Sequence, residues 1–113
     1  MKIYHNPRCS KSRQTLKLIQ DAGVEPEIVE YLNSPPTEKE LDEILTMLGI
    51  EPDALMRKGE AIYKELGLAT KKLSREEAIT VMVENPKLIE RPIVVKGKQA
   101  VVGRPPENVN ELL

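Results

Sequence analysis

The fold is decided at the amino end of the chain, where residues 1–32 read MKIYHNPRCSKSRQTLKLIQDAGVEPEIVEYL. Lys2 to His5 is predicted as a short strand, and the Asn6-Pro7 pair after it favours a turn. Apolar residues then recur at helical spacing from Lys11 to Ala22, and Glu27 to Leu32 is predicted as a second strand. The chain therefore opens as strand, helix, strand.

The first helix is predicted to begin directly after Cys9. Ser10 is expected to cap this helix, because a serine hydroxyl can accept the amide hydrogens of a first turn, and Gly23 is suited to end it. The inner side of the helix is predicted to carry Thr15, Leu18, Ile19 and Ala22. A strand thus delivers the cysteine to a helix amino terminus.

Residues 34–84 are predicted to be mainly helical. Two capping boxes mark helix starts, one from Thr37 to Glu40 and one from Ser74 to Glu77, and Gly49 suits the end of the first of these helices. Shorter helical pieces are expected around residues 53–57 and 60–66.

The carboxyl end is predicted to form a hairpin and a closing helix. The runs 92–95 and 100–102 are rich in β-branched residues, and Gly97-Lys98 between them suits a type II′ turn. Pro105-Pro106 presets the backbone of a final helix. The order β-α-β, helices, β-β-α is that of a thioredoxin-like α/β fold, with a four-stranded mixed sheet and a helical insertion at about 34–84 between its βαβ and ββα halves. We expect a single domain over residues 1–113.

Composition narrows the classes of function. The 113 residues are 40% hydrophobic but only 3% aromatic, and 17 Lys and Arg against 18 Asp and Glu leave a net charge of -1. No global field attracts nucleic acid or an anionic membrane, and no apolar run is long enough to span one. One Cys and one His exclude an internal disulfide and a four-ligand zinc site, so no metal is expected. We expect an unexported, cytoplasmic protein.

The lone thiol has a setting that favours reactivity. A helix amino terminus offers unpaired N–H groups and partial positive charge, which stabilise a thiolate and equally hold an oxyanion. Arg8, Lys11 and Arg13 surround Cys9, and His5 stands four residues before it. A buried, inert cysteine is the alternative, but those usually have apolar neighbours. We therefore predict that Cys9 is a nucleophile.

Two familiar motifs fail at this cysteine. The phosphatase loop needs Arg six residues after Cys, and position 15 is Thr; a redox pair needs a second Cys, and position 12 is Ser. Ser12 can donate a hydrogen bond to a thiolate but cannot resolve a disulfide. A catalytic cycle would therefore need thiols from outside.

Other candidate residues are less specific. His5 could assist the thiol, although a lone His at a strand end is often only a hydrogen-bonded surface residue. Arg57, Arg91 and Arg104 each stand beside a predicted element end, where a guanidinium could turn into a cleft or simply be solvated. Sequence spacing does not bring the three together.

The run from Tyr4 to Arg13, YHNPRCSKSR, resembles the active-site loop of glutaredoxin-dependent arsenate reductases, the ArsC-like family. Further blocks resemble that family in the right order along essentially the whole chain: residues 55–58, 63–68, 85–89, 91–95 and 103–105. The resemblance implies a thioredoxin-like fold, with a cis proline at Pro92.

The resemblance also implies an activity and roles. Cys9 matches the nucleophile, His5 and Ser12 match supporting positions, and the three arginines match those that bind the oxyanion. It implies that arsenate is reduced to arsenite, with glutathione as co-substrate, glutaredoxin as the protein that clears the mixed disulfide, and no tightly bound cofactor.

Two other functions are compatible with the sequence. The Spx transcription regulators share this family and bind RNA polymerase, but their redox switch usually uses a C-x-x-C pair, which Ser12 lacks here. A glutathione-dependent thiol-disulfide reductase is the nearer alternative. Its substrate has no oxyanion for the three arginines to hold, which favours arsenate reduction.

Overall fold

The sheet is built from four short strands in the order β2-β1-β3-β4. In the computed structural model, which describes all 113 residues, β1 (Lys2–Tyr4) pairs in parallel with β2 (Glu27–Val29) and antiparallel with β3 (Ile93–Lys96), which pairs antiparallel with β4 (Gln99–Val102). The predicted four-stranded mixed sheet and thioredoxin-like α/β order are confirmed.

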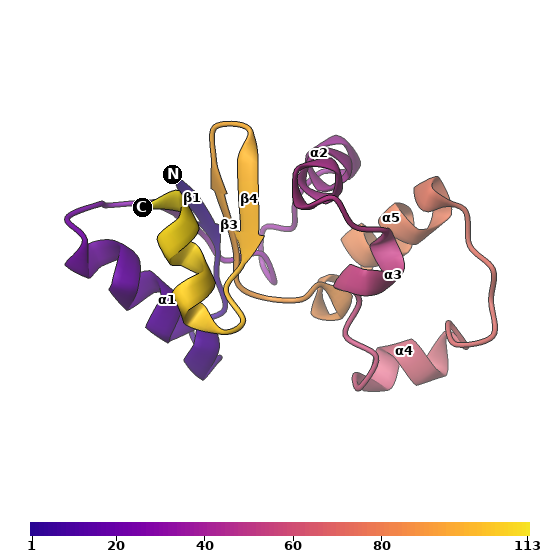
Figure 1. Ribbon diagram of the computed structural model, residues 1–113. Coiled ribbons are helices and arrows are strands. Elements are labelled where there is room, and N and C mark those ends of the chain that lie inside the picture. Colours follow the sequence, from indigo (N-terminus) through magenta and orange to yellow (C-terminus); the bar gives the residue numbers. More distant parts are fainter. The chain divides into compact units, whose positions relative to one another are not determined.

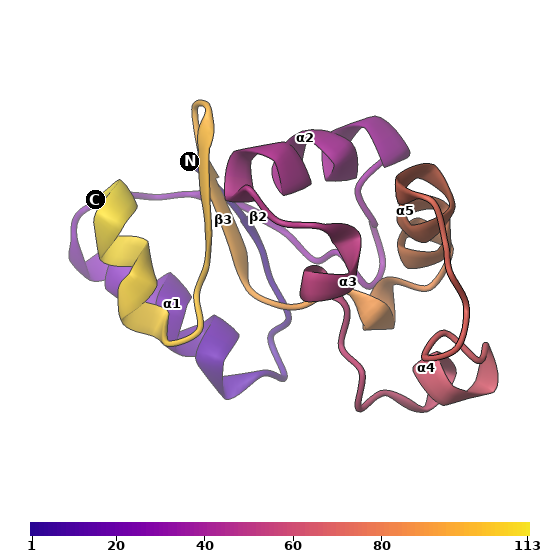
Figure 2. The ribbon, with the colours of Figure 1, turned by 45° about the vertical axis from the view of Figure 1, so that its right-hand side comes forward.

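The chain divides into two compact units. The first comprises Met1–Ser34 and Arg91–Leu113, and the second is Pro35–Glu90. In the first unit, α1 (Ser10–Asp21) and the 3₁₀ helix η2 (Pro106–Leu112) lie side by side against the sheet (Figures 1 and 2). Their packing forms a core of five buried side chains: Ile3, Ile19, Val94, Val109 and Leu112.

The first helix differs from the prediction at its start and on its inner side. Its N-cap is Cys9 and not Ser10, so the thiol sits at the helix boundary itself. The buried residues are Ser12, Thr15 and Ile19, whereas Ala22 is exposed at the C-cap. Gly23 follows with a φ of 83°, a left-handed backbone that favours glycine, as its predicted place at the helix end requires.

The second strand is shorter than predicted and ends at Val29. Its partner β1 has only three residues, so the ladder closes at the pair Tyr4 and Val29. The amides of Asn33 and Ser34 then both bond the carbonyl of Glu30 at 3.0 Å, which turns the chain away. The β-branched and aromatic run extended beyond Val29, but it had no neighbouring strand to pair with.

The hairpin matches its prediction, and the closing helix differs in type. Gly97 has a φ of 60°, and no residue other than glycine has a positive φ, so the turn between β3 and β4 is of the II′ kind. The last helix is 3₁₀ over its whole length, not α.

The second unit is helical, as predicted. It contains α2 (Glu38–Leu48), α3 (Pro52–Leu55), α4 (Ala61–Glu65), α5 (Arg75–Glu84) and the 3₁₀ turn η1 (Pro86–Leu88). Both capping boxes are present, and Gly49 ends α2 with a φ of 67°. α2 and α5 pack together, and their buried residues are Leu41, Ile44, Leu45, Ala78, Ile79 and Met82.

Candidate active site

Cys9 is held by a tight loop between β1 and α1. The amide of Cys9 bonds the carbonyl of Asn6 at 3.0 Å, and the amide of Arg8 bonds Oδ1 of Asn6 at 3.0 Å, so the Asn6 side chain reinforces the turn. The Arg13 guanidinium adds a bond of 2.9 Å to the carbonyl of Pro7. The residue itself is extended, with φ -95° and ψ 123°, and only 8% exposed.

The thiol stands where the first turn of α1 presents its amides. The Cys9 carbonyl accepts the amide hydrogen of Arg13 at 3.0 Å, which starts the helix, and the N–H groups of the preceding residues in that turn have no partner within the helix. Those groups and the helix dipole favour negative charge at this point. The amino terminus of a helix is in general a favourable place for an oxyanion.

Arg104 brings a positive charge to the thiol. Its Nη1 lies 3.8 Å from Cys9 Sγ and donates to the carbonyl of Arg91 at 3.3 Å. Asn108, in η2, donates through Nδ2 to the carbonyl of Arg104 at 3.1 Å and to that of Val102 at 3.1 Å. The side chain of Asn108 thus holds the backbone from which the guanidinium projects.

Arg91 lies on the neighbouring loop, directly before β3. Its Nε and Nη1 atoms are buried, and the Arg91–Pro92 bond is cis, as the family resemblance predicted. The Arg104–Pro105 bond is also cis. The amide of Gly103 bonds the carbonyl of Pro92 at 2.9 Å, which joins the two arginine-bearing loops.

His5 and Ser12 are buried partners. Nδ1 of His5 lies 2.6 Å from Oγ of Ser12, which also accepts the amide hydrogen of Asn6 at 3.0 Å. These two bonds tie the end of β1 to the first turn of α1, on either side of the loop that carries Cys9. Burial lowers the pKa of His5, the nearby charge of Glu30 opposes that shift, and Arg13 adds to it. The imidazole is therefore neutral at pH 7.

The buried, neutral His5 predicts a loss of stability in acid. Because its pKa in the folded state is below the unfolded value of about 6.5, the unfolded state binds more protons, and stability falls as pH drops through that range. We expect the free energy of unfolding to decrease more for the wild type than for His5→Gln when the pH is lowered from 7.5 to below 6. Urea titrations at the two pH values measure both decreases. Parallel pH profiles for the two proteins would contradict this assignment.

Gly103 is packed too closely to accept a side chain. A Cβ built there would lie 2.5 Å from Oγ1 of Thr15 and 2.8 Å from Cγ of Pro92. Thr15 is itself fully buried, with its hydroxyl bonded to the carbonyl of Lys11 at 2.8 Å. The phosphatase motif would have Arg at position 15, and in this chain Thr15 packs closely against Gly103 instead.

We expect Gly103→Ala to lower the free energy of unfolding by about 1–3 kcal/mol, the usual range for overpacking. Gly59→Ala is the matched control, since a Cβ there meets nothing within 4 Å. Urea denaturation of both variants tests this. Equal stability of the two variants would show that Thr15 and Pro92 yield without cost.

Arg57 belongs to the second unit. It follows α3, and its guanidinium contacts two carboxylates, with Nη1 3.4 Å from Oε1 of Glu60 and Nε 3.7 Å from Oε1 of Glu90. The other predicted site residues, His5, Cys9, Ser12, Arg91 and Arg104, all belong to the first unit.

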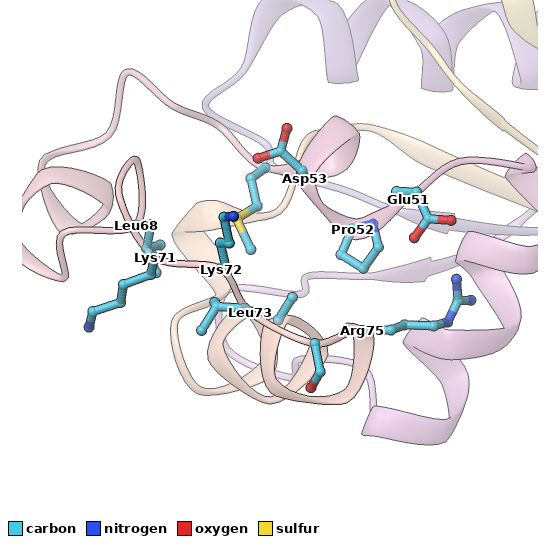
Figure 3. Close-up of a pocket in the computed structure, with 11 residues that line it drawn as sticks. Glu51, Pro52, Asp53, Leu68, Lys71, Lys72, Leu73 and Arg75 are labelled. Atoms are coloured by element: carbon cyan, nitrogen blue, oxygen red, sulfur yellow. The ribbon is translucent and has the colours of Figure 1, made fainter.

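The second unit also contains a cavity of about 360 Å³ beside the start of α5 (Figure 3). Its charged lining is partly neutralised, since Asp53 pairs with Lys58 at 2.9 Å and Arg75 pairs with Asp42 at 2.8 Å. Its apolar lining consists of Pro52, Met56, Leu68, Leu73 and Ala78. The cavity holds neither the cysteine nor the histidine of the chain.

No cluster of three or more His, Cys, Asp or Glu side chains is arranged to hold a metal ion. No helix combines the length and the apolar character that crossing a bilayer requires.

The sheet, the cis proline and the thiol at the start of α1 define a thioredoxin-like protein with a single cysteine. The family model of the ArsC family matches residues 4–112. The chain belongs to the ArsC family.

Relatives agree with that membership. The chain is 54% identical to a protein of Escherichia coli K12 called Uncharacterized protein YfgD, over 100% of this chain and 96% of the relative. It is 46% identical to the arsenate reductase of Escherichia coli K12, over 98% of this chain and 79% of the relative. The structure of arsenate reductase from Vibrio cholerae is similar with a TM-score of 0.95 and 50% identity, covering 99% of this chain and 96% of that one.

Sequence reasoning missed the residues that support the arginines. The sequence predicts Asn108 only as part of a closing helix and Glu60 only as part of a short helical piece. Hydrogen bonds between a side chain and a distant carbonyl leave no periodic signal in a sequence. Two signals existed: Gly103 stands within a block that resembles the family, and Glu60 follows Arg57 by three residues, a spacing that allows an ion pair.

Proposed function

We propose that this chain reduces arsenate to arsenite with Cys9 as the nucleophile. The observation that carries the proposal is the approach of the Arg104 guanidinium to within 3.8 Å of Cys9 Sγ at the amino terminus of α1. A guanidinium lies beside the thiol, and Cys9 is the N-cap residue of α1, a setting that suits both a thiolate and a bound tetrahedral oxyanion. The 46% identity to an arsenate reductase supports the same substrate.

In the proposed mechanism, the Cys9 thiolate attacks arsenic and one arsenate oxygen leaves as water after it is protonated. The thiolate of glutathione then attacks Sγ of Cys9. The S–As bond breaks, its electron pair goes to arsenic, and arsenite leaves as the two sulfurs become a disulfide. Two thiols are thereby oxidised and arsenic is reduced by two electrons.

The arginines have distinct parts in this proposal. Arg104 and Arg91, on the two loops joined by the bond between Gly103 and Pro92, bind the oxyanion and offset the charge that develops during attack. Arg57 is the third ligand, on the ground of the family resemblance. His5 and Ser12 keep the thiol loop against α1 through their hydrogen bonds.

External thiols complete the cycle, because the chain has one cysteine. Glutathione serves as co-substrate, and glutaredoxin removes the glutathionyl group from Cys9. No tightly bound cofactor takes part. A reducing cytoplasm is the compartment that supplies these thiols and keeps the cysteine reduced between turnovers.

Purified protein tests the proposal in an assay that couples glutathione disulfide formation to NADPH oxidation through glutathione reductase. We expect arsenate-dependent turnover that requires both glutathione and glutaredoxin. A low-molecular-weight disulfide is run beside arsenate as a competing substrate. Turnover of the disulfide without turnover of arsenate would overturn the proposal in favour of a thiol-disulfide reductase.

A further inference from the structure

Arg57 is surrounded by negative charge. Glu60 lies 3.4 Å from its Nη1 and Glu90 lies 3.7 Å from its Nε, and the side chains of all three residues are 27–29% exposed. Charge-assisted hydrogen bonds are usually about 2.7–2.9 Å long. The two contacts are therefore ion pairs of ordinary strength and not tight bonds.

The backbone holds the three residues in this arrangement. Met56 and Ile89 form an antiparallel bridge, with the amide of Arg57 bonded to the carbonyl of Leu88 at 2.7 Å and the amide of Glu90 bonded to that of Leu55 at 2.9 Å. The amide of Glu60, the N-cap of α4, bonds the carbonyl of Arg57 at 3.3 Å. Both carboxylates are thus kept beside the guanidinium by local structure.

The pattern of contacts limits how Arg57 can bind an anion. A guanidinium clasps a tetrahedral oxyanion through two parallel N–H bonds, from its Nη1 and Nη2 or from its Nε and Nη2. Glu60 occupies the first of these pairs at Nη1, and Glu90 occupies the second at Nε. In each of the two possible pairs of donor nitrogens, one nitrogen of Arg57 therefore already faces a carboxylate.

We propose that Glu60 and Glu90 act as internal competitors of the oxyanion for Arg57. The inference rests on the proposed function, in which Arg57 is an oxyanion ligand. A bound oxyanion displaces one carboxylate from the guanidinium, so the two glutamates set the concentration of substrate at which Arg57 is engaged. They are specificity-determining residues, because a dianion competes with a carboxylate better than a monoanion does.

Binding of sulfate, a tetrahedral dianion that thiols do not reduce, tests the inference by isothermal titration calorimetry. We expect Glu60→Gln and Glu90→Gln each to lower the sulfate Kd by about twofold to fivefold, the range for partly exposed ion pairs. Glu65→Gln, an exposed glutamate of α4, controls for the change in net charge. Both gains should shrink below twofold in an Arg57→Gln background.

Local unfolding in a glutamate variant would weaken sulfate binding. A gain in sulfate affinity that depends on Arg57 therefore does not arise from unfolding. Unchanged or weaker sulfate binding in both glutamate variants would overturn the inference. It would also be overturned if the single variant Arg57→Gln bound sulfate with the same Kd as the wild type. Arsenate turnover of the wild type is measured separately. Its absence would overturn the proposed function, whereas turnover combined with unaltered Kd values would overturn the competition alone.

Discussion

Cys9→Ser is expected to abolish arsenate reduction in the glutathione- and glutaredoxin-coupled assay. A serine hydroxyl is not ionised near neutral pH and forms no S–As or S–S bond, so neither the adduct nor the mixed disulfide can form. Loss of a nucleophile lowers kcat by at least about 10³-fold. The variant should fold normally, because Ser matches Cys closely in size and the thiol's hydrogen-bonding contact is with Arg104, at 3.8 Å.

Ser10→Ala is the matched control for this substitution. Ser10 is the neighbouring residue in the same turn, and its side chain is exposed. We expect wild-type turnover from Ser10→Ala and unchanged sulfate affinity in Cys9→Ser. Turnover by Cys9→Ser above the background without enzyme would rule out Cys9 as the nucleophile.

Arg104→Ala is expected to lower kcat/KM for arsenate by about 10²–10³-fold, the range for loss of one preorganised group that stabilises developing charge. The guanidinium is the positive group that the structure places at Cys9 Sγ, and one of its nitrogens reaches both the sulfur and the carbonyl of Arg91. Arg104→Lys should recover only part of the loss, because an ammonium lacks the planar fork that clasps an oxyanion.

Lys98→Ala, at the exposed hairpin turn, removes one positive charge from the same unit and controls for net charge. Steady-state kinetics over a range of arsenate concentrations separates kcat from KM in each variant. Equal kcat/KM values for Arg104→Ala and Lys98→Ala would show that Arg104 takes no part in the reaction.

Local patterns in the sequence predicted the elements well where each signal lies within one turn. The capping boxes at Thr37 and Ser74 and the glycine turn at Gly97 form as expected, because the groups that bond are three residues apart or fewer. The end of β2 was predicted too far along the chain. Strand length depends on the partner strand, and the sequence around Tyr31 contains no information about where β1 stops.

The candidate site likewise has features that follow from neighbouring residues and features that depend on residues distant in the chain. Cys9 at a helix start follows from an adjacent strand, turn and helix, and the missing second cysteine is visible as Ser12. The contact between Cys9 and Arg104 spans 95 positions of the chain, and no spacing predicts it. The family resemblance pointed to these arginines without showing what holds them.

By itself, the sequence determined the opening strand, turn and helix, and it determined that a single thiol has no second cysteine in the chain to pair with, since these depend on neighbouring residues and on a count of one. Only the tertiary structure decided which groups surround that thiol. Asn108 holds the loop of Arg104, and Gly103 leaves room for Thr15, through contacts between residues distant in the chain. Such contacts exist only after the sheet and helices have packed, because packing and not chain spacing brings those atoms within bonding distance.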